Sequence, residues 1–230
     1  MNKEDTLRAL LRIGTTGDYP PVSSYDASTG EFSGQDVALI RDFARDQGYA
    51  LEFVLTRWPS LMQDLLAGQF EIAVGGISRT QQRETLALTS QPIGFTGKVA
   101  LVRGGEESKY CSLAAIDTAE TTVVEDRGGT NEQFARAHIK RAKLTILPDN
   151  EAPFASLLDR RADVMFTDSV EALYRQQTTP GLRAVRPEQP YTRVKKIFLF
   201  RKDQKALRDQ FDNWLVTHGR SAADIHEPTG

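Results

Sequence analysis

Residues 121–148 read TTVVEDRGGTNEQFARAHIKRAKLTILP, and this stretch decides the fold class. TTVVED has the β-branched composition of a strand. The two glycines after it mark a turn, and the residues from there to HIK are typical of a helix. KLTILP returns to the composition of a strand. A strand, a helix and a second strand in this order indicate a parallel sheet covered by helices.

The same alternation of elements occurs elsewhere in the chain. Strands are predicted over 11–16, 50–56, 70–75 and 162–167, and helices over 35–48, from about Trp58, and over 152–161. Gly48 stands where the end of a helix favours glycine. Each run of elements spans roughly 60–75 residues, near the small end of domain size. The sequence therefore predicts an α/β protein with two lobes.

Two extended segments are expected to join these lobes, KVALVRG at 98–104 and KKIFLFRK at 195–202. The predicted division assigns 1–99 plus 193–230 to the first lobe and 100–192 to the second. In open α/β sheets, ligands bind beyond the carboxyl ends of the strands. A ligand cleft is therefore expected between the lobes.

Composition narrows the possible partners. The 230 residues include 29 Lys+Arg and 31 Asp+Glu, a formal net charge of -2, which disfavours nucleic-acid binding. No apolar run approaches the ~18–20 residues of a membrane helix. The single cysteine, Cys111, excludes an internal disulfide, and the three histidines lack the spacing of metal ligands. Phosphate-binding glycine motifs are absent from the sequence. We expect a small-molecule ligand, no metal and no cofactor.

The N-terminus, MNKED, lacks the apolar core of a signal peptide. Two interpretations stay open: the protein is cytoplasmic, or its numbering starts after a removed export signal.

Four turns that follow predicted strands contain small or polar residues with exposed backbone N–H groups, which suit carboxylate binding. They cover residues 15–19, 75–78, 128–131 and 167–171. The guanidinium of Arg83 is suited to a carboxylate. Ser78 and Arg83 in one lobe, with Thr130 and Asp168 in the other, would bracket a cleft with anion-binding and cation-binding groups. An α-amino acid or a keto acid fits that chemistry.

Each candidate also has a plainer interpretation. Thr130 with Gln133, and Asp168 with Glu171, have the three-residue spacing of a capping box at the start of a helix. The other candidates, whose ordinary roles are surface charge or packing, are Arg83, Lys98, Tyr19 and Trp58. Taken singly, none of these patterns is specific.

Several stretches resemble the amino-acid-binding family of type II periplasmic solute-binding proteins, over roughly 11–216. They are GTTGDYPP, FSGQDVALIRDFA, LLAGQFEIAVGGIS, QQRETLALTSQP and GGTNEQFARA. The resemblance implies two α/β lobes joined by two hinge strands. It implies that Arg83 holds a ligand carboxylate with Ser78 and Thr130, that Asp168 takes the α-ammonium, and that Tyr19 and Trp58 flank the side chain. Gly76, Gly129 and Asn131 complete the expected substrate-binding set.

A narrower resemblance is to the cyclohexadienyl dehydratases, and it is carried by TTGDY, WPSLM, GGISR, GGTNEQFARA, LPDN, FTDSVEA and EQPY. These enzymes convert prephenate to phenylpyruvate, and arogenate to phenylalanine, by loss of water and carbon dioxide. The resemblance implies a carbon–oxygen lyase in the periplasm, with Glu171 as the general acid and Lys98 in the active site.

Two other functions stay open, an amino-acid-binding protein of an ABC transporter and a sensor domain of a larger receptor. The sequence departs from the dehydratase pattern at PPVSSY (20–25), at Arg79, and at THGRSAADIHEPTG (217–230). These departures leave the ligand and the level of activity open, and they do not alter the expected fold.

Overall fold

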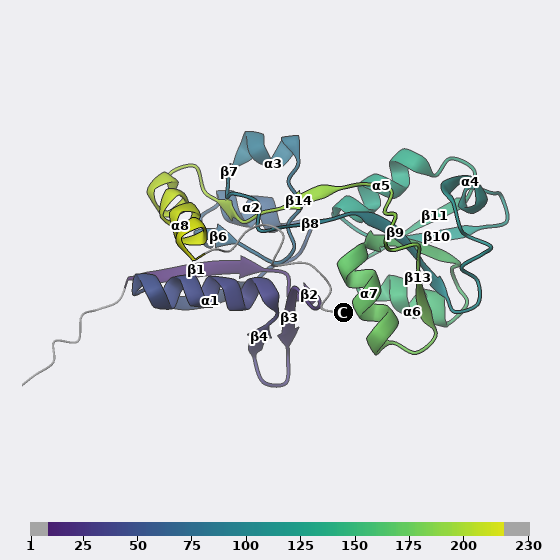
Figure 1. Cartoon of the computed structure of the whole chain (residues 1–230), viewed down its shortest axis with the longest axis horizontal. Coiled ribbons are helices and arrows are strands. Elements are labelled where there is room, and N and C mark those ends of the chain that lie inside the picture. The colour runs from purple at the N-terminus through teal and green to yellow at the C-terminus, as the bar shows by residue number, and fades with distance from the viewer. Residues whose placement is uncertain (1–8, 219–230) are drawn as a thin grey trace, which may run out of the picture. The chain divides into compact units, whose positions relative to one another are not determined.

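The computed structural model describes residues 9–218 of the chain (Figure 1). Backbone contacts divide these residues into two compact units. The first unit comprises 9–17, 22–91 and 197–218, and the second comprises 18–21 and 92–196. Each unit has its own mixed sheet with helices packed against it, as expected for a type II periplasmic binding protein fold.

The sheet of the first unit has the strand order β5-β1-β6-β15-β7. These strands are β1 (Leu10–Thr15), β5 (Ala50–Leu55), β6 (Ile72–Ala73), β7 (Leu88–Thr89) and β15 (Leu199–Phe200). β1 pairs parallel with both β5 and β6, whereas β15 is antiparallel to β6 and β7. The predicted parallel pairing is therefore confirmed for the centre of this sheet.

Helices α1 (Gln35–Gln47), α2 (Leu61–Leu66), α3 (Gln81–Leu86) and α8 (Lys205–Thr217) belong to the first unit, as does the hairpin of β3 (Ser23–Asp26) and β4 (Glu31–Ser33). α1 packs against β5 and against the hairpin of β3 and β4; Figure 1 shows these elements in one part of the chain. It ends at Gly48, whose left-handed φ of 75° favours glycine, as predicted. Phe43 of α1 contacts Phe211 and Trp214 of α8 edge-on, with ring centroids 5.2 and 5.6 Å apart. These aromatic contacts pack the two helices together.

The second unit has the strand order β11-β10-β12-β9-β13. These strands are β9 (Lys98–Arg103), β10 (Thr122–Asp126), β11 (Lys143–Leu147), β12 (Val164–Asp168) and β13 (Leu182–Val185). The helices are α4 (Leu113–Ile116), α5 (Thr130–His138), α6 (Ala152–Leu158) and α7 (Ser169–Thr178). β10 is parallel to β11 and β12, so residues 121–148 form the strand, helix and strand that their sequence predicts.

The prediction that 98–104 crosses between the lobes is wrong. This segment forms β9, which lies inside the sheet of the second unit and pairs antiparallel with β12 and β13. Residues 99–102 are fully buried, because both faces of an interior strand are covered. Two other short strands of this unit, β8 (Gly94–Thr96) and β14 (Val194–Lys196), pair antiparallel with each other outside the main sheet.

The unit boundaries differ from the predicted 1–99 plus 193–230 and 100–192. They fall after Gln91 and after Lys196, because β8, β9 and β14 pair within the second unit. Residues 18–21, which contain β2 (Asp18–Tyr19), also belong to the second unit. Residues 1–8, with the question of an export signal, and 219–230, with most of the altered C-terminus, lie outside the described residues.

Candidate functional site

A buried ionic cluster in the second unit is centred on Asp168, the last residue of β12. Antiparallel pairing places Lys98, the first residue of β9, opposite it in register. Lys98 Nζ lies 2.9 Å from Asp168 Oδ1, and Lys196 Nζ lies 2.6 Å from Oδ2. The hydroxyl of Tyr19 donates to the same Oδ2 at 2.7 Å. Asp168 thus binds two ammonium groups and a phenol while only 3% exposed.

The charges around Asp168 determine its ionisation. Burial alone would raise its pKa. The positive charges of Lys196 and Lys98, with the hydrogen bonds from Lys196 and Tyr19, outweigh burial and hold the pKa well below its usual range. Asp168 is therefore a carboxylate at neutral pH. The resemblance implies that it takes a substrate ammonium, whereas in the structure its oxygens contact two ammonium groups of the protein.

A second branch of this cluster runs through Asn131 in the first turn of α5. Lys98 Nζ donates to Asn131 Oδ1, and Asn131 Nδ2 donates to Asp126 Oδ1 at 3.1 Å. Burial raises the pKa of Asp126 to about 6, although the hydrogen bond from Asn131 and the charge of Lys98 oppose the rise. Gly129, which precedes the helix, lies so close that an added Cβ would be 3.3 Å from Asp126 Oδ2. Glycine therefore fits this turn.

Glu171, in the first turn of α7, is completely buried. Its Oε1 accepts a 3.0 Å hydrogen bond from Asn150 Nδ2, and its Oε2 accepts one from Thr167 Oγ1. Burial raises the pKa of Glu171 to about 8, against the opposing effects of Thr167, Arg175 and Asn150. At neutral pH most of the molecules therefore carry a protonated Glu171, which can donate a proton.

Both capping-box interpretations are wrong. Asp168 is the N-cap residue of α7 but makes no side-chain capping bond, and the carboxyl group of Glu171 bonds to Asn150 and Thr167. α5 begins at Thr130, with Gly129 as its N-cap residue, so Thr130 is not in the capping position. The three-residue spacing of Asp168 and Glu171 therefore does not reflect a capping box, because the Glu171 side chain bonds within the buried site instead.

The first unit brings two predicted site residues together. Arg83 and Ser78 are 9% and 3% exposed, and Nη1 of Arg83 donates to the Ser78 carbonyl at 2.6 Å. The hydroxyl of Thr80 caps α3 by accepting from the backbone N–H of Arg83 at 3.3 Å. This cap fixes the start of the helix that carries the guanidinium.

Gly76, in the turn after β6, donates through its N–H to Oδ2 of buried Asp36 at 2.7 Å. Its φ of 72° requires the left-handed conformation that glycine adopts easily. Trp58 is half-buried and packs against the apolar cluster that contains Leu61 and Leu65, so its indole supports the core of this unit.

Four residues of the second-unit site were not predicted individually from the sequence, although Thr167 falls in the predicted turn 167–171. They are Lys196, Asn150, Asp126 and Thr167. Lys196 was included only in an expected joining segment, although a lysine directly before the apolar run IFLF is a usable sign of burial. Asn150 belongs to the LPDN stretch that carries the narrower resemblance, but nothing local indicates that it reaches Glu171.

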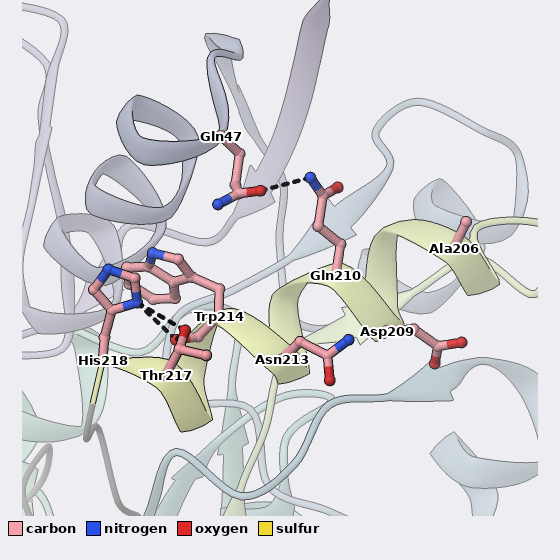
Figure 2. Close-up of a pocket in the computed structure, with 8 residues that line it drawn as sticks. All are labelled: Gln47, Ala206, Asp209, Gln210, Asn213, Trp214, Thr217 and His218. Carbon is pink, nitrogen blue, oxygen red and sulfur yellow. Dashed lines mark hydrogen bonds between the residues drawn. The ribbon is translucent and has the colours of Figure 1, made fainter.

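A hollow of about 450 Å³ lies on the first unit between α8 and the end of α1 (Figure 2). Gln210 Nε2 donates to Gln47 Oε1 at 2.7 Å across it, and His218 bonds to the last turn of α8. None of the predicted site residues lines this hollow. Gln47 with Gln210, and Thr217 with His218, bond to each other within it, and it lacks the predicted site residues, so it is not a candidate site.

Within residues 9–218, no group of three or more His, Cys, Asp or Glu side chains could hold a metal ion. The helices in this range include none that is both long and apolar enough to span a bilayer.

Comparison with known proteins gives consistent matches. The family model for bacterial extracellular solute-binding proteins, family 3, matches residues 11–223. The chain is 38% identical to cyclohexadienyl dehydratase of Pseudomonas aeruginosa, over 90% of this chain and 76% of that protein. It is 24% identical to the L-cystine-binding protein TcyJ of Escherichia coli K12, over 79% of this chain and 67% of that protein.

Among solved structures, the fold matches the ancestral amino acid-binding protein AncCDT-1, described as a precursor of cyclohexadienyl dehydratase. The TM-score is 0.85 and the identity 29%, over 93% of this chain and 91% of that chain. The family match covers most of the chain, and the two-sheet architecture agrees with it. The chain belongs to the bacterial extracellular solute-binding proteins of family 3.

Proposed function

We propose that this protein is a cyclohexadienyl dehydratase, a carbon–oxygen lyase that acts on prephenate, on arogenate, or on both. The observation that carries the proposal is Glu171, a fully buried carboxyl group whose pKa burial raises to about 8. A transporter-type binding protein has no need for a protonated acid in its ligand site. The 38% identity to a dehydratase over most of both chains supports the same conclusion.

In the proposed reaction, Glu171 donates its proton to the C4 hydroxyl of prephenate, which leaves as water. The bond between the ring and its carboxylate breaks, carbon dioxide leaves, and the electron pair enters the ring, which becomes aromatic. One proton is consumed for each phenylpyruvate formed, so solvent must reprotonate Glu171 before the next turnover. Hydroxide is a poor leaving group, and this explains the need for an acid that is protonated near neutral pH.

The other predicted residues bind and orient the substrate in this proposal. Arg83 and Ser78, with Thr130, would hold the carboxylate of the substrate side chain, for which a buried guanidinium is well suited. Lys98 would bind the ring carboxylate that is lost. Its contacts with Asp168 and Asn131 hold this ammonium group in place.

The proposal is tested by incubating the purified protein with prephenate and following phenylpyruvate by ultraviolet absorbance. We expect turnover by the unaltered protein and its loss in Glu171→Gln. An unaltered, folded protein that produces no phenylpyruvate from prephenate and no phenylalanine from arogenate would overturn the proposal.

The second candidate function is binding of an amino acid for transport. The family match and the likeness to an ancestral amino acid-binding protein favour it. Calorimetric titration with amino acids distinguishes the two functions. Tight binding of an amino acid without turnover of either dehydratase substrate would establish the binding function instead.

We also propose that the protein acts in the periplasm. The family consists of extracellular solute-binding proteins, which supports this location. Fractionation of cells that express the complete gene tests it, and recovery with the cytoplasmic fraction would contradict it.

A further inference from the structure

The two oxygens of the Glu171 carboxyl group have different neighbours. Oε1 lies 3.0 Å from Asn150 Nδ2, at the end of the turn that follows β11. Oε2 contacts Thr167 Oγ1, one residue before the end of β12. All three side chains are buried, at 0%, 2% and 0% exposure for Glu171, Asn150 and Thr167. Water therefore does not replace either contact.

The Asn150 amide can act only as a donor here. Its Nδ2 also donates to the backbone carbonyl of Asp18 at 2.7 Å, so both of its N–H groups are used. Rotating the amide by 180° would place its oxygen against the backbone carbonyl oxygen of Asp18, which can only accept, so this bond would be lost whichever oxygen of Glu171 carries the proton. The partners thus fix the amide orientation, and Oε1 of Glu171 must be an acceptor.

The Thr167 hydroxyl has no such restriction, because a hydroxyl can donate or accept. It can accept a hydrogen bond from a protonated Oε2 and, after the proton has left, rotate to donate to the resulting carboxylate. Oε2 is therefore the oxygen whose environment suits both protonation states.

We infer that Asn150 and Thr167 are positioning residues that give the two oxygens of Glu171 separate roles, with Oε1 fixed as an acceptor and Oε2 carrying the transferable proton. The proton leaves from Oε2. The negative charge that remains on the carboxylate is stabilised by one hydrogen-bond donor at each oxygen. The catalytic meaning of this arrangement rests on the proposed dehydratase function, whereas the assignment of the oxygens does not.

Other charges also act on Glu171. On α7 itself, Arg175 favours the ionised form, while Asp126 of β10 opposes it, and Glu125 of β10 also interacts with it. Asn150 and Thr167 stabilise the carboxylate by donating to it, which lowers the pKa below what burial alone would give. Removing either donor should therefore raise the pKa of Glu171 and weaken its alignment.

The first test measures the protonation of Glu171 directly, so it does not depend on activity. The carboxyl carbon of Glu171 is followed by ¹³C NMR across a pH titration and is assigned by its absence in Glu171→Gln. We expect Asn150→Leu to raise the pKa of Glu171 by about one pH unit, the scale of a hydrogen bond to a charged group. Asn213→Leu, on the exposed face of α8, is the control and should change nothing.

An unchanged or lowered pKa in folded Asn150→Leu would overturn the inference. Because this variant also removes the bond to Asp18, Thr167→Val serves as an independent test with almost no change in volume. It too should raise the pKa of Glu171, and Thr167→Ser, which keeps the hydroxyl, should restore it. Thr145→Val in β11 is the matched control. A Thr167→Ser variant that behaves like Thr167→Val would count against the role of the hydroxyl.

The second test applies to the enzyme. In Asn150→Leu and Thr167→Val, kcat for prephenate should fall roughly 10-fold or more with little change in KM, and the alkaline limb of the kcat profile should move to higher pH. A merely structural role would not move that limb. Inactivity of the unaltered protein would refute the dehydratase function, while the NMR titration would still decide the inference.

Discussion

Tyr19 and Asp168 lie 149 positions apart in the chain, yet the Tyr19 hydroxyl donates a 2.7 Å hydrogen bond to Oδ2 of Asp168. One residue earlier, the carbonyl of Asp18 accepts a bond from Asn150. These two hydrogen bonds attach the short segment 18–21 to the rest of the second unit. Their partners there, Asp168 and Asn150, both belong to the candidate site. This explains why an early part of the sequence belongs to the second unit.

We expect Tyr19→Phe to lower the free energy of unfolding by roughly 1.5–3 kcal/mol, the range for a hydrogen bond to a charged group. Tyr49→Phe provides the matched comparison, since its hydroxyl donates to a neutral partner, Gln210 Oε1, at 2.8 Å. That variant should lose only about 0.5–1.5 kcal/mol. Urea unfolding measures both, and a larger loss in Tyr49→Phe would contradict the assignment of Tyr19 to Asp168.

Glu171→Gln should lower kcat for prephenate by at least about 10²-fold, the lower range for loss of a general acid. The amide keeps the size of the side chain and an acceptor oxygen for Asn150, so KM and the fold should change far less. Steady-state kinetics at neutral pH check this result. Arogenate should show the same loss, because the proton is needed to release the same hydroxyl.

The stability difference between the unaltered protein and Glu171→Gln should depend on pH. The pKa of Glu171 is about 8 in the folded protein against an ordinary 4.5. Between these values the unfolded chain releases the proton while the folded protein keeps it. The stability of the unaltered protein should therefore fall relative to the variant as pH rises from about 4.5 to 8, by a few kcal/mol in order of magnitude.

Urea unfolding of both proteins at pH 5, 6.5 and 8 tests this dependence. Glu125 and Asp126 also have raised pKa values, but both proteins contain them, so the comparison reports mainly on Glu171. A difference in stability that stays constant across this range would show that Glu171 is not held protonated by the fold.

Local sequence patterns were sufficient for most elements of the fold. The apolar spacing of Val37, Ile40 and Phe43 predicted α1, and Gly48 marked its end. The apolar run 99–102 led to a wrong prediction because a buried strand and a joining strand have the same composition. Only its partners, β12 and β13, distinguish them, and those partners are 60 or more positions away in the sequence.

In the candidate site, too, contacts between residues close in the sequence could be predicted, whereas contacts between distant residues could not. Arg83 and Ser78 are five positions apart, and their contact follows from one turn and one short helix. The contact between Lys196 and Asp168 depends on the tertiary fold instead. The apolar run after Lys196 is a sign that this lysine is buried, but no local pattern indicates that its partner is Asp168, so the sequence could not predict that Asp168 is already paired.

Lys196→Met should be strongly destabilising, by about 3–5 kcal/mol, because it removes one partner of a buried ion pair. Asp168 would keep Lys98, but its pKa should rise once the larger of its two favourable charges is lost. Lys195→Met is the matched control. Lys195 is the exposed neighbour on the same strand, and its loss should cost less than about 0.5 kcal/mol. Equal effects of the two changes on urea unfolding would contradict the burial of Lys196.

Arg83→Ala tests the proposed carboxylate contact. A charge-assisted, bidentate bond to a buried guanidinium should contribute on the order of 2–4 kcal/mol to binding, so KM for prephenate, or the Kd of a bound amino acid, should rise about 30-fold or more. Arg79→Ala is the control, because Arg79 is partly exposed and forms its ion pair with Glu84 on the surface of the same unit. Its loss should change affinity by less than about 3-fold, since surface ion pairs contribute little. If the two variants bind equally well, the substrate carboxylate is not held by Arg83. Among the described residues of the candidate site, the remaining cations that could bind it are then Lys98 and Lys196 of the second unit.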